Sequence, residues 1–170
     1  RRAPGEAHIS VRGLRKRFGS LEAVRGIDME IPRGQVYGLL GPNGAGKTTT
    51  IRMLCGLSRP SGGSASVMGV DVGAEPERVR GMLGIVPQGN VLDRDLTVND
   101  NLVYHARLHR MVPSHYEPRI REVLDLVGLA DRSDEWPLNL SGGMKRRFTI
   151  AKALLHEPSV LVLDAPTTGL

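Results

Sequence analysis

Cysteine is almost absent from this chain of 170 residues, because Cys55 is the only one. A disulfide within the chain and a metal site built from several cysteines are therefore excluded, a usage that fits a reducing cytosol. Long apolar runs are also missing, and none approaches the ~20 residues that a membrane-spanning helix needs. Residues 1–6 are basic, but no apolar stretch follows them, so we expect no secretory signal there.

The remaining composition is typical of a globular protein, with 40% apolar and 24% charged residues. The length predicts one domain with a core of its own. A net charge of +5 is compatible with affinity for nucleic acid or for an anionic membrane surface. Lysine and arginine are scattered along the chain, however, and so we expect no nucleic-acid partner.

Apolar patterning predicts strands separated by a long helical block. The expected strands are residues 9–11, 23–31, 35–40, 64–68, 83–86 and 160–163. The expected helices are one that begins near Gly46, then residues 98–110 and 117–127, and one that Ser141 caps. This order predicts an α/β fold in which strands on both sides flank an inserted helical subdomain.

The end of the chain predicts a fragment. Leu170 comes shortly after the strand expected at residues 160–163, and no helix follows to cover that strand. Because a parallel strand is normally buried on both faces, we expect the carboxyl-terminal part of the domain to be missing.

A glycine-rich string follows the strand expected at residues 35–40 and matches the phosphate-loop pattern G-x-x-x-x-G-K-[ST]. Its residues are Gly41, Pro42, Asn43, Gly44, Ala45, Gly46, Lys47 and Thr48. The glycines clear the backbone so that N–H groups approach a polyphosphate closely. Lys47 is expected on the β- and γ-phosphates, Thr48 on magnesium, and Thr49 on a further phosphate oxygen.

An aspartate, Asp164, ends the apolar run at residues 160–163. At the carboxyl edge of a sheet, beside a phosphate loop, such a carboxylate holds magnesium directly or through water. The alternative is a solvated aspartate in a turn, which the presence of the phosphate loop disfavours.

A third motif is Ser141-Gly142-Gly143 at the expected start of a helix. A serine N-cap followed by two glycines predicts a second cradle for an anion. The alternative is a capping motif with a flexible first turn, although each glycine costs roughly 1 kcal/mol of helix stability relative to alanine.

Together these motifs resemble the nucleotide-binding subunit of ATP-binding-cassette (ABC) transporters, over nearly the whole chain. Residues 41–48 are similar to the Walker A motif of that family, 140–143 to its signature and 160–164 to its Walker B motif, while Gln88 occupies the position of its Q-loop glutamine. Within the family, residues 92–98 and 141–147 resemble exporters of the daunorubicin-resistance and nodulation-factor types.

The resemblance implies a single nucleotide-binding domain with a P-loop NTPase core and a mixed sheet. Residues 1–87 and 158–170 are the expected core, and residues 88–157 the helical subdomain. The implied ligands are ATP and Mg²⁺. The implied partners are a second nucleotide-binding subunit, in a homodimer or heterodimer, and a separate integral membrane subunit. The implied location is the cytoplasmic, inner face of the cell membrane.

The resemblance also assigns roles to residues. The implied catalytic residues are Lys47, Gln88 and Asp164. The implied magnesium ligands are Thr48, Gln88 and Asp164. Ser141, Gly142 and Gly143 act on the ATP of the partner subunit. The ring of Phe18 stacks on adenine, the alternative being ordinary packing in the core.

The chain departs from the family pattern at two places. Ala165 occupies the position of the glutamate that polarises the attacking water, and a methyl group accepts no proton. The D-loop aspartate and the switch histidine would follow Leu170. Two hypotheses stay open: an ATPase subunit that powers an exporter, and a degenerate regulatory subunit that binds ATP without hydrolysing it.

A third class, a soluble cassette protein that acts on DNA or the ribosome, is disfavoured. DNA-repair relatives separate the Walker A motif from the signature by a long coiled coil, and the interval between Lys47 and Ser141 leaves no room for one. Five histidines match no functional position, and we expect them to be on the surface or hydrogen-bonded; they are His8, His105, His109, His115 and His156.

Overall fold

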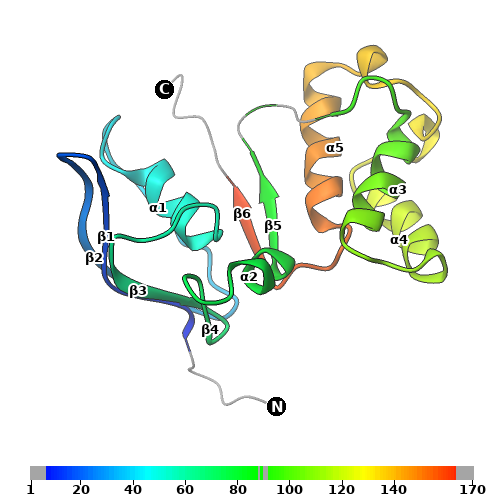
Figure 1. Cartoon of the computed structure of the whole chain (residues 1–170). Helices are drawn as coiled ribbons and strands as arrows, with labels where there is room; N and C mark the ends of the chain where they lie inside the picture. Colours follow the sequence, from blue (N-terminus) through cyan, green and yellow to red (C-terminus); the bar gives the residue numbers. More distant parts are fainter. Residues whose placement is uncertain (1–6, 88, 90–91, 164–170) are drawn as a thin grey trace. The chain divides into compact units, whose positions relative to one another are not determined.

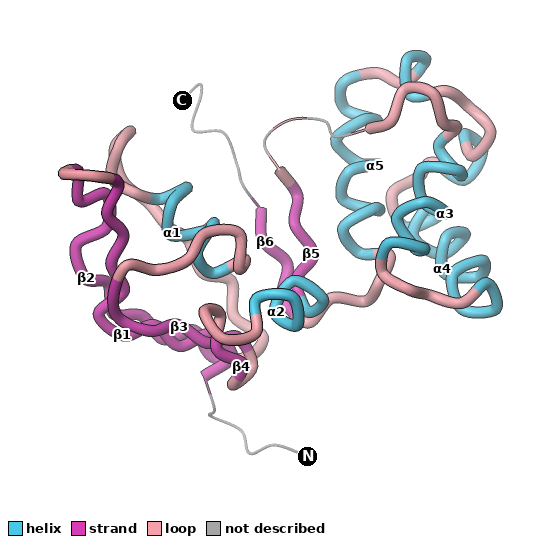
Figure 2. Tube along the Cα trace, in the orientation of Figure 1, coloured by secondary structure: helices cyan, strands magenta, loops and turns pink. Residues whose placement is uncertain are grey.

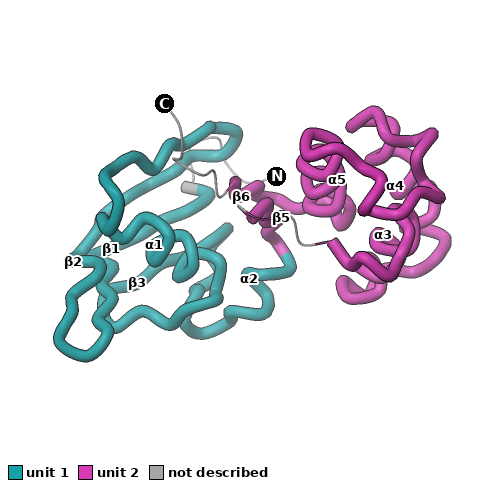
Figure 3. The backbone as a smooth tube through the Cα atoms, turned by 90° about the horizontal axis from the view of Figure 1, so that it is seen from above, with its two compact units in different colours: residues 1–81 teal, residues 82–170 magenta. Residues whose placement is uncertain are grey.

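The computed structural model describes residues 7–87, 89 and 92–163, and the chain divides into two compact units (Figures 1 and 3). The first unit is residues 1–81. It contains strands β1 (Ala7–Phe18), β2 (Leu21–Pro32), β3 (Gly62–Val67) and β4 (Val70–Asp71), helix α1 (Lys47–Leu54) and most of helix α2 (Pro76–Met82). The second unit is residues 82–170. It contains strands β5 (Leu83–Val86) and β6 (Val160–Leu163), helices α3 (Val98–Leu108), α4 (Pro113–Leu126) and α5 (Gly142–Leu154), and the 3-10 turns η1 (Ala130–Arg132) and η2 (Pro137–Asn139).

The first unit is built on an antiparallel sheet with the strand order β2-β1-β3-β4. The β1–β2 hairpin turns at Gly19, whose φ of +57° lies in the left-handed region. Val11 pairs with Met29 on one side and with Ala65 on the other, and all three side chains are buried. The strands expected at residues 9–11, 23–31 and 64–68 are confirmed, with β1 and β2 longer than predicted.

The prediction of a strand at residues 35–40 is wrong. Figure 2 shows loop between β2 and α1, and residues 35–40 pair with neither described sheet. Val36 and Leu40 are almost fully exposed. An apolar run gives a segment the propensity for a strand, but a strand forms only where a neighbouring strand accepts its backbone hydrogen bonds, and no described strand pairs with residues 35–40.

The second unit contains a parallel pair of strands. Leu83 pairs with Val160, and Val86 pairs with Leu163, so that β5 and β6 end side by side. The strands expected at residues 83–86 and 160–163 are therefore confirmed. Gln88 and Asp164, which follow these ends, lie outside the described residues.

Helices α3, α4 and α5 enclose a common apolar core. Thr97 caps α3 by accepting a 3.1 Å hydrogen bond from the Asp100 N–H, and Gly128, with a φ of +64°, follows α4 as predicted. Helix α4 begins earlier than expected because Pro113 occupies its first turn, where proline is tolerated. The fully buried members of this core are Val98, Leu102, Ala106, Val123, Phe148, Ala151 and Leu155.

The two compact units divide at Gly81 and Met82, and β5 and β6 fall in the same unit as α3 to α5 (Figure 3). The expected division into a core of residues 1–87 and 158–170 and a helical subdomain of residues 88–157 stays a prediction. Among the described residues, no helix is both long enough and apolar enough to span a membrane.

Candidate functional site

Gly46 forms the junction between the phosphate loop and α1. It is the N-cap of α1 and has a φ of +84°, which side chains rarely adopt. Its carbonyl accepts a 2.8 Å hydrogen bond from the Thr50 N–H, so the helix begins directly at the loop. A Cβ atom at position 46 would collide with the carbonyl oxygen of Ala23 in β2. Both the backbone conformation and the close packing therefore require glycine here.

The N-terminus of α1 is capped differently from those of α3 and α5. The hydroxyl groups of Thr97 and Ser141 accept hydrogen bonds from backbone N–H groups in the first turns of α3 and α5. Gly46 has no side chain to do the same for α1, which lacks a side-chain cap. The first-turn N–H groups and the positive end of the helix dipole are thereby left for an anion.

Lys47 turns its ammonium group back over the loop. Its Nζ donates hydrogen bonds to the carbonyl oxygens of Gly41 (2.5 Å) and Pro42 (2.7 Å). The same Pro42 carbonyl accepts a 3.2 Å hydrogen bond from the Ala45 N–H, which closes the turn. The loop therefore holds a cation beside the N-terminus of α1, in the arrangement that attracts a polyphosphate.

The neighbouring predicted ligands differ in exposure. Asn43, Gly44 and Thr48 are exposed, whereas Thr49 is partly buried. The Thr48 hydroxyl group, in the first turn of α1, is thus accessible to a magnesium ion that accompanies a phosphate.

Phe18 lies at the end of β1 and is 53% exposed. The alternative of ordinary core packing is therefore wrong. The Lys16 Nζ lies 5.1 Å from the centroid of the ring, within cation–π range. Stacking on adenine stays a prediction.

No contact with the described residues requires the two glycines of the signature-like motif. Ser141 Oγ accepts a 3.2 Å hydrogen bond from the Met144 N–H, as an N-cap does. Gly142 and Gly143 follow it with ordinary helical φ angles and are exposed, and a Cβ atom on either would meet nothing among the described residues within 4 Å. The missing side chains leave the start of α5 open to a group from outside the chain.

Helix α5 is also tied to the end of β5. The Arg146 Nη1 donates a 2.6 Å hydrogen bond to the carbonyl of Pro87, the residue before Gln88. Gln88, Asp164 and Ala165 lie outside the described residues, so their predicted roles remain predictions.

The prediction for the histidines is confirmed for His156, whose Nε2 lies 3.0 Å from the carbonyl oxygen of Leu83, but it does not hold for Nε2 of His105. His105 Nε2 and His156 Nδ1 are buried and have no hydrogen-bond partner among the described residues. The sequence carried one signal for this, the i, i+4 spacing of His105 and His109, which places both on one face of a helix. Nothing in the sequence pattern associates His156 with that pair.

Comparison with known proteins places the chain in a family. A family model described as ABC transporter matches residues 24–168. The chain belongs to the ABC transporter family. The resemblance inferred from the motifs is thereby confirmed, and so is the α/β fold class of a P-loop NTPase.

Curated relatives of this ABC protein have names that include export or drug resistance. It is 44% identical over 162 residues to the Nod factor export ATP-binding protein I of Ralstonia nicotianae, covering 95% of this chain and 50% of that protein. It is 46% identical over 162 residues to the daunorubicin/doxorubicin resistance ATP-binding protein DrrA of Streptomyces peucetius, covering 95% and 49%. The chain thus spans about half the length of these relatives.

Solved structures agree with the fold of the ABC family. A structure titled ATP binding subunit of ABC transporter superposes with a TM-score of 0.83 at 31% identity, over 95% of this chain and 68% of that one. The cbiO1 protein from Clostridium perfringens, titled part of the ABC transporter complex cbiONQ, superposes with a TM-score of 0.85 at 30% identity, over 96% and 67%.

Proposed function

We propose that this chain is the ATP-binding region of an ABC exporter, which couples the binding and hydrolysis of ATP to transport through a separate membrane subunit. The observation that carries the proposal is the junction at Gly46. Gly46 has a left-handed backbone conformation and packs against Ala23. At this junction the N-terminus of α1, which has no side-chain cap, and the ammonium group of Lys47 both lie beside the phosphate loop.

ATP binding follows from the chemistry of this loop. Backbone N–H groups of residues 43–49 would donate to the phosphates, and Lys47 would exchange its bonds to loop carbonyls for bonds to phosphate oxygens. Thr48, Gln88 and Asp164 would hold Mg²⁺, which supplies charge neutralisation at the β- and γ-phosphates. The exposed ring of Phe18 would cover the adenine.

The glycine-rich first turn of α5 supports a two-subunit site. The Ser141 hydroxyl group caps this helix, and Gly142 and Gly143 leave its first turn without side chains, which suits the phosphates of an ATP held by another nucleotide-binding subunit. Each subunit would supply its phosphate loop to one ATP and its residues 141–143 to the other ATP, so two subunits would form a closed dimer with two-fold symmetry. The dimer is either a homodimer or a heterodimer.

Export is the transport direction that the relatives favour. The names of the Nod factor and daunorubicin proteins refer to export and to drug resistance, and cbiO1 is described as part of a transporter complex. We extend these properties to this chain as part of the proposal. The same reasoning places it in the cytoplasm, on the inner face of the cell membrane, against an integral membrane subunit.

A second candidate rests on Ala165. Because alanine cannot act as a general base, ATP would bind and close the dimer without rapid turnover, as in a degenerate regulatory subunit. The two candidates share the binding step and differ only in hydrolysis.

Titration calorimetry with Mg-ATP, beside a phosphate-release assay on the same purified protein, tests both candidates. Saturable binding with steady phosphate release supports the motor subunit, and saturable binding without release supports the regulatory subunit. Absence of binding refutes both.

A further inference from the structure

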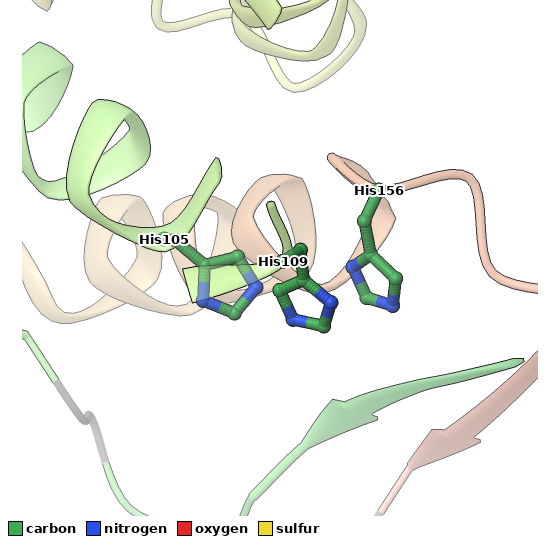
Figure 4. Close-up of side chains that lie close together, drawn as sticks. All are labelled: His105, His109 and His156. Carbon is green, nitrogen blue, oxygen red and sulfur yellow. The ribbon is translucent and has the colours of Figure 1, made fainter. Parts of the chain in front are cut away.

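Three histidines lie together in the second unit, apart from every motif discussed above. His105 is in the last turn of α3, His109 is its C-cap, and His156 follows α5. Figure 4 shows the three rings in a row with His109 between the other two. The ring centroids of His109 and His156 are 3.8 Å apart, and those of His105 and His109 are 4.6 Å apart.

The nitrogen atoms of this cluster are close enough to serve one ion. One nitrogen from each ring lies within 4.8 Å of one from each of the others. Two nitrogens bound to the same Zn²⁺ at tetrahedral angles lie about 3.4 Å apart, so the rings must rotate to bring all three nitrogens to one ion.

Two nitrogens of the cluster form no hydrogen bond with the described residues. His105 Nε2 and His156 Nδ1 are both buried without a hydrogen-bond partner. An unpaired buried polar atom of this kind destabilises the folded chain, and a ligand at the same place would remove that cost. Two such atoms in a single cluster point to a shared ligand that accepts nitrogen lone pairs.

A contact outside the cluster shows which nitrogen of His156 is protonated. His156 Nε2 lies 3.0 Å from the carbonyl oxygen of Leu83 in β5. Because a carbonyl only accepts, Nε2 carries the proton and Nδ1 keeps its lone pair. A backbone carbonyl on the far nitrogen is the arrangement that orients metal-bound histidines.

We propose that His105, His109 and His156 form a binding site for one divalent transition-metal ion of the zinc type. Neutral imidazole is a preferred ligand of such ions, whereas Mg²⁺ and Ca²⁺ prefer oxygen. The ion fastens the end of α3 to the segment between α5 and β6. The ring planes of His109 and His156 are nearly parallel, with an angle of 14° between them. Nitrogen lone pairs in parallel rings do not point to a common atom, so His109 must rotate out of this stack to bind the same ion.

The local charges are compatible with this proposal. Burial is the main cause that lowers the pKa of all three histidines, which favours the neutral form that binds a metal ion. Lys152 is the nearby cation that opposes a metal ion, but burial lowers its pKa as well, and Asp93 provides a compensating negative charge.

Zinc titration of the purified, nucleotide-free protein tests the site. We expect one Zn²⁺ per chain, a rise in melting temperature with Zn²⁺ and none with Mg²⁺, and a visible absorption band with Co²⁺. The variant His109→Gln removes one ligand of the proposed site, and binding should weaken by at least the roughly tenfold to 100-fold that the loss of an outer-shell partner costs.

His115→Gln is the matched control, because His115 is the remaining histidine of residues 82–170. It should bind Zn²⁺ as the unchanged protein does. Absence of saturable Zn²⁺ binding to the unchanged protein overturns the proposal, and so does equal affinity in His109→Gln when its metal-free melting temperature is normal. Neither outcome bears on ATP binding, because the proposal uses no residue of the nucleotide site.

Discussion

Arg146 and Pro87 are joined by a 2.6 Å hydrogen bond from the guanidinium to the backbone carbonyl. Arg146 lies in the second turn of α5, the helix that Ser141 caps, and Pro87 directly follows β5. The helix of the signature-like motif is therefore anchored to the segment that leads to Gln88. A movement of that segment would pull on α5 through this bond.

Arg146→Ala should lower the free energy of unfolding. The Pro87 carbonyl loses a charge-assisted hydrogen bond in a partly buried place, which costs about 1–3 kcal/mol. Urea denaturation of the two proteins measures the difference. Arg121→Ala, at an exposed position of α4, is the control and should unfold as the unchanged protein does. Equal midpoints for all three proteins would mean that the bond contributes nothing.

Gly142→Ala separates stability from function. Its Cβ atom meets open space, so helix propensity should raise the free energy of unfolding by up to about 1 kcal/mol. If the start of α5 receives the phosphates of a partner's ATP, the same methyl group should weaken ATP-dependent dimerisation. Light scattering with and without Mg-ATP measures this. A stabilised variant that dimerises normally would remove the argument for an external group at this helix.

Ala165→Glu tests the missing general base. A carboxylate at this position should raise phosphate release by about 10²–10⁴-fold, the usual contribution of general-base catalysis. Ala165→Gln is the matched control, since a carboxamide of the same shape accepts no proton, and it should leave the rate low. Rapid turnover by the unchanged protein, or no gain in the glutamate variant, would contradict the role assigned to this position.

The histidine cluster predicts loss of stability in acid. Burial, followed by the charges of His109, Lys152 and His156, lowers the pKa of His105 from 6.5 to about 3. Below pH 6.5 the unfolded chain binds a proton that folded His105 refuses, so stability falls as the pH falls. In metal-free buffer with a chelator, we expect a loss of roughly 2 kcal/mol between pH 7 and pH 5.

His105→Gln removes the group responsible for this pH dependence. Its unfolding free energy, measured by urea denaturation at several pH values, should show a smaller slope over the same range. An unchanged slope would assign the acid sensitivity to other groups.

Features with local causes were predictable from the sequence. Thr97 and Ser141 cap α3 and α5 because a hydroxyl at an N-cap satisfies a nearby N–H group without help from the rest of the fold. Gly19 and Gly128 mark their turns because a positive φ favours glycine. The phosphate loop belongs to the same class, since its pattern encodes a backbone shape.

Features that depend on distant partners were not predictable in this way. The segment at residues 35–40 has strand composition, but its state depends on whether a neighbouring strand accepts it. His156 joins His105 and His109 only because α5 packs against α3 and carries its following residues to the end of that helix. Periodicity within one element contains no information about such a meeting.

The central claim is that the loop at residues 41–48 binds the phosphates of ATP through Lys47 and the N-terminus of α1. Calorimetric titration of Mg-ATP into the purified protein and its Lys47→Met variant measures this directly, with Arg33→Met at an exposed turn as the charge-matched control. The account predicts saturable binding to the unchanged protein and the control, and loss of binding in Lys47→Met at an unchanged melting temperature. Equal affinity in Lys47→Met, or no binding to any of the three, would contradict it.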